Sequence, residues 1–216
     1  MKRWTFSSLD KFNTCPKQYY HLRVARDVVD PPSPQKAWGE MVHTALENYV
    51  KEGKVLPEGM KQWGPFVDKL KALPGQIFTE HEFAIDRNFQ PCSWDDAWSR
   101  GIADVFILGK DRAVVVDYKT GKRKPSQQLC LYALYVFATH PEVEFVHTCF
   151  AWLKDQKVDK QTYHRSEMSD LWQEFLPTLS RLESAHDKDY WPPRPSGLCR
   201  KWCPVVSCEH NGFYTP

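Results

Sequence analysis

The sequence predicts an α/β fold in which helices cover a mixed β-sheet. Helical and strand-like patterns follow one another in the order helices, strand, hairpin, helix, hairpin and helix. The composition is that of an ordinary soluble domain, with 42% apolar and 26% charged residues, and internal repeats are absent. At 216 residues the chain is long enough for one sizeable core, so we expect a single domain over residues 1–216.

Two classes of protein are disfavoured by simple patterns. No apolar run approaches the ~20 residues that span a bilayer, and the start, MKRWTFSSLD, lacks the apolar stretch of a secretory signal. We therefore expect a cytoplasmic protein without a membrane partner.

The net charge of only +2 does not indicate nucleic-acid binding, so any such site must come from local clusters of basic residues.

The first helices are short. Ser7 or Ser8 can cap one helix, Pro16 can begin a second in its permitted first turn, and Cys15 lies at the joint. The proline-rich segment DPPSPQ, residues 30–35, is expected to be a connector that ends this part of the chain.

Residues 37–50 are expected to form a longer amphipathic helix. Its apolar side chains recur at helical spacing and should be buried. They are Trp38, Met41, Val42, Ala45, Leu46 and Tyr49. His43 lies on a different face, where it is either an exposed helix histidine or, with Glu47 one turn on, a polar pair aimed into a cleft.

Residues 77–85, IFTEHEFAI, alternate loosely as a strand. Glu82 would lie there among apolar neighbours, either as a further ligand or as an edge charge.

A hairpin follows, with strands at residues 102–108 and 113–118 around a short polar turn. If Leu108 pairs with Ala113, then Asp104 falls opposite Asp117, with β-carbons roughly 5 Å apart. Lys119 shares a face with Asp117, because residues two apart on a strand point the same way.

Two facing carboxylates repel, so a buried pair must share a proton or hold a cation. Carboxylates favour Mg²⁺ or Mn²⁺ over zinc, and the neighbouring Lys119 could then orient or deprotonate an attacking water. The alternative is a surface hairpin with solvated charges and an incidental ion pair between Asp117 and Lys119.

Beyond the hairpin, the basic run Lys122, Arg123 and Lys124 is either a solvated loop or a set of contacts to a phosphate backbone. Gln128 and Tyr132, four residues apart, face the same way on the next helix.

The remaining elements complete the alternation. We expect a helix over residues 126–138, an antiparallel pair at 143–153 and 158–164, and a helix over 168–185 that is kinked at Pro177.

Seven cysteines in a chain without a secretion signal argue against a disulfide framework. Cys199, Cys203 and Cys208 fall in a tail with no apolar periodicity, which is typical of metal ligands. The fourth ligand is either His210, which gives a zinc site, or Cys15, which gives a zinc or iron–sulfur site.

With Cys15 as the ligand, residues 1–36 and 191–216 form a small metal lobe that joins the two ends of the chain. The α/β core then spans residues 37–190.

In this order the motifs resemble the RecB-type branch of the PD-(D/E)xK nuclease superfamily over most of the chain. GEMVHTALE, residues 39–47, looks like the family helix that carries Gly, Glu and His. Gly101 to Asp104 looks like its Gly-x-x-Asp strand, and DYKTG, residues 117–121, looks like its Asp-x-Lys strand. Gln128 to Tyr132 looks like a Gln-x-x-x-Tyr element.

The resemblance implies a restriction-endonuclease-like core with Asp104, Asp117 and Lys119 as catalytic residues. By the same resemblance, His43, Asp104, Asp117 and the carbonyl of Tyr118 would bind Mg²⁺ or Mn²⁺. Gln128 and Tyr132 would line the path of DNA, Lys122, Arg123 and Lys124 would hold its phosphates, and Glu82 is a supporting candidate.

Some members, including AddAB-type nuclease subunits and CRISPR-associated spacer-acquisition nucleases, hold an iron–sulfur cluster with one N-terminal and three C-terminal cysteines. Cys15 and the tail CRKWCPVVSC look similar, which implies a [4Fe–4S] cluster with zinc as the alternative. Here three residues and then four separate the tail cysteines, whereas relatives usually have two and then more, so the nuclearity stays open.

The resemblance therefore implies an exonuclease that acts on DNA ends or single strands, without a helicase motor. DNA is the expected partner, together with other recombination or replication proteins, and a phage-encoded protein in the host cytoplasm would fit. The alternative is a non-catalytic nucleic-acid-binding adaptor or assembly factor with a structural zinc or iron–sulfur site.

Overall fold

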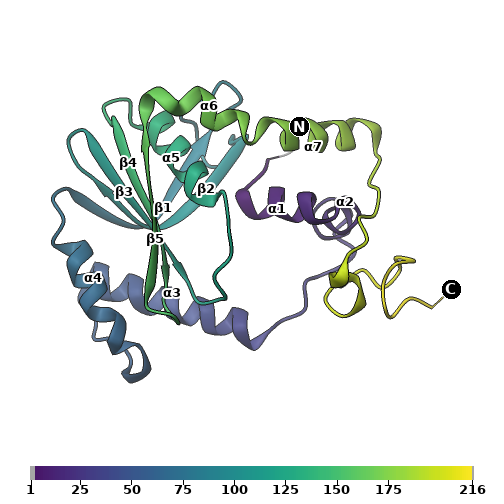
Figure 1. Cartoon of the computed structure of the whole chain (residues 1–216), viewed down its shortest axis with the longest axis horizontal. Coiled ribbons are helices and arrows are strands. Elements are labelled where there is room, and N and C mark those ends of the chain that lie inside the picture. Colours follow the sequence, from purple (N-terminus) through teal and green to yellow (C-terminus); the bar gives the residue numbers. More distant parts are fainter. Residues whose placement is uncertain (1–2, 216) are drawn as a thin grey trace. The chain divides into compact units, whose positions relative to one another are not determined.

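A computed structural model describes residues 3–215, which divide into two compact units. The central unit is residues 33–172, and the terminal unit combines residues 3–32 with 173–215. Figure 1 shows the chain coloured from its N-terminus to its C-terminus. The last long helix belongs to the terminal unit, although residues up to 190 were expected in the core.

The central unit contains a five-stranded sheet in the order β1-β2-β3-β4-β5. Its strands are β1 (Gln76–Ile85), β2 (Ser99–Leu108), β3 (Arg112–Lys119), β4 (Phe145–Trp152) and β5 (Lys157–His164). Its helices are α3 (Pro34–Glu52), a 3₁₀ helix (Glu58–Trp63), α4 (Gly64–Lys71), α5 (Gln128–Thr139), a 3₁₀ turn (Arg165–Glu167) and α6 (Met168–Gln173).

The sheet is mixed, as predicted. Strands β3 and β4 run parallel and are joined through α5, whereas the other neighbours are antiparallel. The hairpin register is also confirmed, because Leu108 pairs with Ala113.

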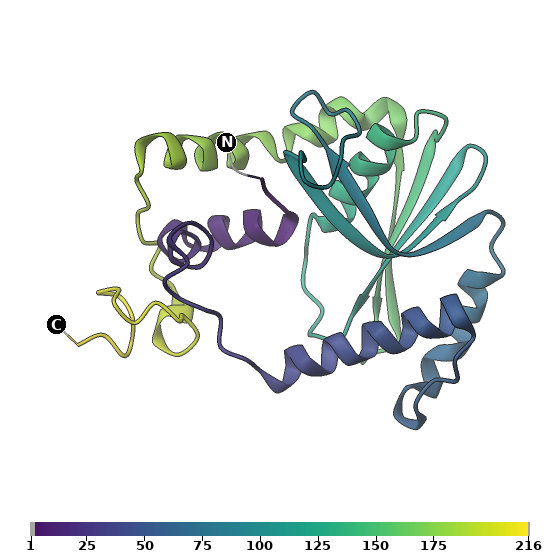
Figure 2. The ribbon, with the colours of Figure 1, turned by 180° about the vertical axis from the view of Figure 1, so that it is seen from behind.

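Helices α3 and α4 lie on one face of this sheet, as Figure 2 shows from behind. Val42 and Leu46 of α3 are fully buried against a cluster that includes Val105, Val116 and Tyr118. Ala45 and Tyr49 are partly buried against the same cluster. The prediction that Trp38 and Met41 are buried was wrong. Their exposed fractions are 43% and 57%.

Helix α5 covers the other face and is apolar nearly all round, as expected for a helix inside a core. Tyr135 stacks on Phe83 of β1 with an interplanar angle of 13°. The end of the helix is held by Arg165, whose guanidinium donates to the carbonyls of Phe137, His140 and Val143.

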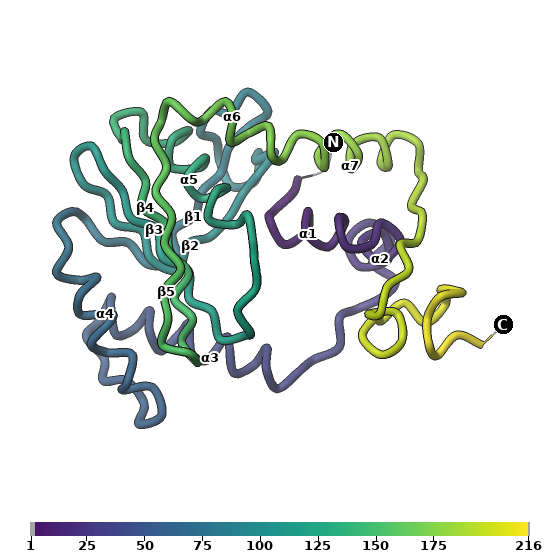
Figure 3. Tube along the Cα trace, viewed as in Figure 1, coloured from purple at the N-terminus to yellow at the C-terminus, as the bar shows by residue number. Residues whose placement is uncertain are grey.

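The terminal unit is built from helices at both ends of the chain, which the trace in Figure 3 follows. They are α1 (Phe6–Thr14), α2 (Pro16–Tyr19), a π-helical turn (Tyr20–Ala25), α7 (Leu176–Lys188) and a 3₁₀ turn (Gly197–Arg200). Trp191 contacts the rings of Tyr19, Tyr20 and His186.

Three local expectations needed correction. Thr5 caps α1, and Ser8 is the third helical residue of its capping box. The expected connector is shorter, because Ser33 caps α3 and Pro34 begins it. The helix predicted over 168–185 is two helices, and Pro177 lies in the first turn of α7, where its missing N–H costs nothing.

Among residues 3–215, no helix combines the length and the apolar character that crossing a membrane requires.

Candidate active site

Strands β2 and β3 separate before they reach the two predicted aspartates. Their pairing ends at Val105 and Val116. Beyond this pair, a side chain replaces the backbone as hydrogen-bond partner. The backbone N–H of Tyr118 donates to Oδ2 of Asp104 at 2.5 Å. The Asp104 carboxylate thus opens a fork between the strands.

Helix α3 brings His43 to this fork. Its Nδ1 lies 2.9 Å from Oδ1 of Asp104. Burial disfavours the imidazolium, but the hydrogen bond to Asp104 and the charges of Asp104, Asp117 and Glu80 outweigh it and raise the pKa of His43. Histidine and aspartate, predicted from separate motifs, therefore lie side by side.

Glu80 of β1 joins them. One ligand atom each from His43, Glu80 and Asp104 lies within 4.8 Å of the other two. Partial burial and the neighbouring carboxylates of Asp104 and Glu47 raise the pKa of Glu80, which a bound cation would reverse. His43 and Glu80 also line an open cleft with Gly39, Glu40, Thr44 and Glu47.

Glu80 was not predicted as a site residue, because the prediction assumed regular alternation along β1. Its backbone is left-handed, with φ of 47°, and this turns the chain at the level of Asp104 while the register on either side stays the same. Glu82, the residue singled out from the sequence, is exposed and is not part of the group.

The buried Asp117 and the partly exposed Lys119 form an ion pair next to the fork. Oδ2 of Asp117 lies 2.6 Å from Nζ of Lys119. Burial raises the pKa of Asp117, an effect that Lys119 partly offsets and that the charge of Asp104 increases. Asp117 is thus within electrostatic range of Asp104, although its carboxylate is not one of the three clustered groups.

Tyr118 lies between Asp117 and Lys119 in the sequence and faces the other side of the sheet. Its ring meets His43 edge-on, with centroids 6.1 Å apart. Its hydroxyl is buried, and burial is the main reason that its pKa is raised.

The basic run after β3 is placed beyond Lys119. Arg123 is paired with Asp159 of β5, whose carboxylate also accepts from Nε1 of Trp152 at 2.7 Å. The expected phosphate contact of Arg123 would have to compete with this pairing. Lys122 and Lys124 are exposed.

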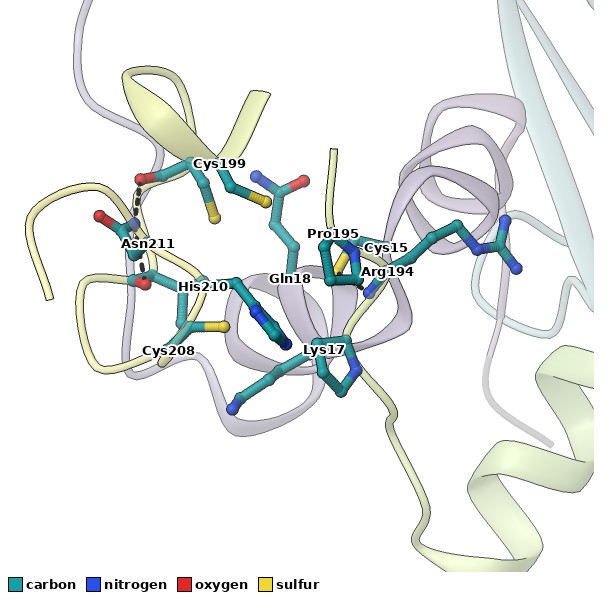
Figure 4. A pocket seen from close by; sticks show the side chains of 12 residues that line it. Cys15, Lys17, Gln18, Arg194, Pro195, Cys199, Cys208, His210 and Asn211 are labelled. Atoms are coloured by element: carbon teal, nitrogen blue, oxygen red, sulfur yellow. Dashed lines mark hydrogen bonds between the residues drawn. The ribbon is translucent and has the colours of Figure 1, made fainter. Parts of the chain in front are cut away.

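The terminal unit gathers the four predicted cysteines around one pocket. Cys15, Cys199, Cys203 and Cys208 line it with Lys17 and His210, and Figure 4 shows that Cys15, Cys199 and Cys208 come from different segments. Burial raises the pKa of Cys203, and the other three cysteines raise it further by their charge.

Backbone groups already point at two of these sulfurs. The N–H of Arg194 donates to Sγ of Cys15 and that of Ser196 to Sγ of Cys199, each at 3.4 Å. Cys15, Cys199, Cys203 and Cys208 are free thiols. The pocket therefore presents hydrogen-bonded sulfurs without a disulfide.

Comparison with known proteins identifies a family and a fold. The sequence profile of the PD-(D/E)XK nuclease superfamily matches residues 3–208. None of the curated proteins matches the chain in sequence.

Two solved structures are similar to this chain. A protein from Eubacterium rectale named "Putative exonuclease" is 11% identical, with a TM-score of 0.51, over 93% of this chain and 86% of its own. The protein SSO0001 is 15% identical, with a TM-score of 0.47, over 98% of this chain and 88% of its own.

Proposed function

We propose that this chain, which belongs to the PD-(D/E)XK nuclease superfamily, is a metal-dependent DNA nuclease that hydrolyses phosphodiester bonds. The observation that carries the proposal is the cluster of His43, Glu80 and Asp104 beside the ion pair of Asp117 and Lys119. Ligands for a cation and a candidate proton acceptor thus meet at the end of one strand pair.

The donor set fits the cation that such chemistry needs. Carboxylates suit Mg²⁺ and Mn²⁺, and one imidazole is compatible with Mn²⁺. His43 Nδ1 and Asp104 Oδ1 are hydrogen-bonded at 2.9 Å, so a cation bound to both would replace the proton between them. His43, Glu80 and Asp104 would hold the cation, with Asp117 as a further carboxylate.

A divalent cation here would supply Lewis-acid stabilisation of the negative charge that develops on the phosphoryl group. The protein supplies the rest. The amine of Lys119 would orient the attacking water or take its proton, and Asp117 keeps that amine at the fork through the 2.6 Å ion pair.

We further propose that the terminal unit carries an iron–sulfur cluster on Cys15, Cys199, Cys203 and Cys208. Tetrahedral zinc holds its sulfurs close together, because each Zn–S bond is only about 2.3 Å long. Within residues 3–215, no three of these cysteine sulfurs, with or without His210, lie within 4.8 Å of one another. A [4Fe–4S] cluster spaces its cysteine ligands further apart, because each cysteine binds a different iron atom.

We propose further that the nuclease acts as an exonuclease. It is supported by the name of the structural neighbour from Eubacterium rectale and by the open cleft at His43 and Glu80, which an end of a strand could enter.

The test uses end-labelled single- and double-stranded DNA, linear and circular, with Mg²⁺, Mn²⁺ or EDTA. Lys119→Ala should abolish cleavage, and Lys110→Ala, which removes an exposed lysine from the turn between β2 and β3, should retain it. Loss of linear DNA only with metal supports the proposal, and the label gives the polarity. Tight DNA binding without cleavage in any metal would instead indicate a non-catalytic adaptor.

A further inference from the structure

Two side chains of α5 reach the catalytic ion pair from inside the core. Nε2 of Gln128 donates to Oδ1 of Asp117 at 3.0 Å, and the hydroxyl of Tyr132 lies 3.1 Å from the same oxygen. Oε1 of Gln128 accepts from Nζ of Lys119 at 2.9 Å. Both ends of one amide are therefore used, with the oxygen on the lysine and the nitrogen on the aspartate.

Tyr132 also holds the fork between β2 and β3. Its hydroxyl donates to the carbonyl of Ile102 on β2 at 2.6 Å, beyond the point where the ladder ends. On the β3 side, Asp104 occupies the N–H of Tyr118. Side chains thus bind a backbone carbonyl of β2 and a backbone N–H of β3 beyond the last residue pair of the β2–β3 ladder.

Burial argues against direct contact with a substrate. Tyr132 is 4% exposed and Asp117 is 5% exposed, and the Tyr132 hydroxyl accepts a hydrogen bond from the Gln128 amide at 3.0 Å. Gln128 is partly exposed, but both ends of its amide are bound to protein groups, so neither side chain offers a free polar group to DNA.

We propose that Gln128 and Tyr132 are positioning residues, which fix Asp117 and Lys119 in their working geometry and do not line the path of DNA. The inference rests on the proposed function and deepens it. It replaces the expectation from family resemblance that these two residues contact the nucleic acid.

The experiment compares Gln128→Met and Tyr132→Phe with Tyr135→Phe in the full-length protein. Tyr135 is a matched control, because it lies one turn further along α5, is 1% exposed and forms a buried hydrogen bond of 2.7 Å with Ser99, away from the ion pair. The readouts are kcat and KM for labelled DNA with Mn²⁺, and the affinity for Mn²⁺ by calorimetry.

The expected result is a loss of kcat of roughly 10- to 100-fold in both variants, since small misplacements of reacting groups cost about that much. KM for DNA should stay within about twofold, as for the loss of an interaction made only in the transition state. The affinity for Mn²⁺ should fall, because Asp117 loses its fixed orientation, and Tyr135→Phe should change none of these quantities.

A rise in KM with kcat retained would overturn the inference in favour of contact with DNA. Effects on kcat and Mn²⁺ affinity no larger than those of Tyr135→Phe would overturn it as well. If the wild-type protein cleaves nothing, the proposed function fails, while the Mn²⁺ affinities of the three variants still decide whether Asp117 is positioned in this way.

Discussion

His43 and Asp104 are 61 positions apart in the sequence, yet His43 Nδ1 lies 2.9 Å from Asp104 Oδ1. One comes from the helix on one face of the sheet and the other from the strand pair that the helix covers. The packing of Val42 and Leu46, which flank His43 on α3 and are fully buried, therefore sets the distance between the two ligands. The position of His43 in the site therefore depends on how α3 packs against the core.

Glu80 and Glu82 offer a test of the metal group within one strand. Glu80→Gln should weaken Mn²⁺ binding by about tenfold or more, since it removes a charged oxygen from the group. Glu82→Gln should leave the affinity unchanged, because Glu82, which is exposed like Glu80, lies outside the cluster. Calorimetric titration with Mn²⁺ measures both, and equal losses in the two variants would contradict the assignment.

Gly101 permits a close approach of β2 to α5. A β-carbon at this position would lie 2.9 Å from Cε2 of the buried Tyr135 ring. Gly101→Ala should therefore lower the free energy of unfolding by about 1–3 kcal/mol, as overpacking does, and lower cleavage through a shift of α5. Urea denaturation checks the first effect. Gly121→Ala is the control, since a β-carbon added there would meet no atom within 4 Å, and a comparable loss there would refute the steric explanation.

Arg165 is expected to be a major determinant of stability outside the site. Its guanidinium satisfies the carbonyls of Phe137, His140 and Val143, and Arg165→Met would leave them without this donor. We expect a loss of about 1.5–3 kcal/mol in the free energy of unfolding, the range typical of hydrogen bonds to a charged group. Arg165→Lys should recover only part of it, because an ammonium cannot span the fork of a guanidinium. Full recovery in the lysine variant would show that charge alone matters.

Two histidines on the α5 face make stability depend on pH. His81 and His140 lie among the rings of Phe78, Phe83 and Phe106. Burial lowers the pKa of both histidines. The charge of His140 lowers the pKa of His81 further, whereas the charge of Glu142 partly offsets the effect of burial on His140.

The ordinary histidine pKa is 6.5. Below this pH the unfolded chain binds protons at these histidines more strongly than the folded chain does. The free energy of unfolding is therefore highest above this pH and falls as the pH drops below it. His81→Phe should flatten that fall between pH 7 and 5. Denaturation at several pH values measures it, with His147→Asn on the opposite sheet face as control. An unchanged slope in His81→Phe would rule out this source.

The cysteine pocket predicts which thiols matter for the cluster. Cys203→Ser should reduce the iron content and the visible absorbance of the anaerobically purified protein, because it removes one of the four proposed ligands. Cys203 is near enough to the other three cysteines for their charges to raise its pKa. Cys92→Ser should have no effect, since Cys92 belongs to the central unit. Metal analysis that finds stoichiometric zinc and no iron would replace the cluster with a zinc site.

Local patterns were enough for much of the central unit. The alternation in β2 and β3 and the short polar turn between them determine the register, so the pairing of Leu108 with Ala113 could be predicted. The burial of α5 followed from its apolar sequence. Both depend on neighbours along the chain.

Other features depend on partners that are distant in sequence. The inward direction of Gln128 is set by Lys119 and Asp117, and nothing in the helix itself shows which face meets the ion pair. Trp38 remains exposed although its spacing on α3 is that of a buried residue, because the covered stripe of this helix is narrower than its apolar pattern. Glu80 could not be found by alternation, since its own backbone interrupts the alternation.

The left-handed backbone of Glu80 has a consequence for how this protein would respond to selection. A residue with a β-carbon is disfavoured in that conformation by roughly 1–2 kcal/mol, and glycine is not. A laboratory screen for heat resistance alone would therefore favour glycine at position 80 and discard the carboxylate that reaches His43 and Asp104. Robustness and cation binding are opposed at this single position, and variants recovered from such a screen should withstand heat better and hold the cation less well.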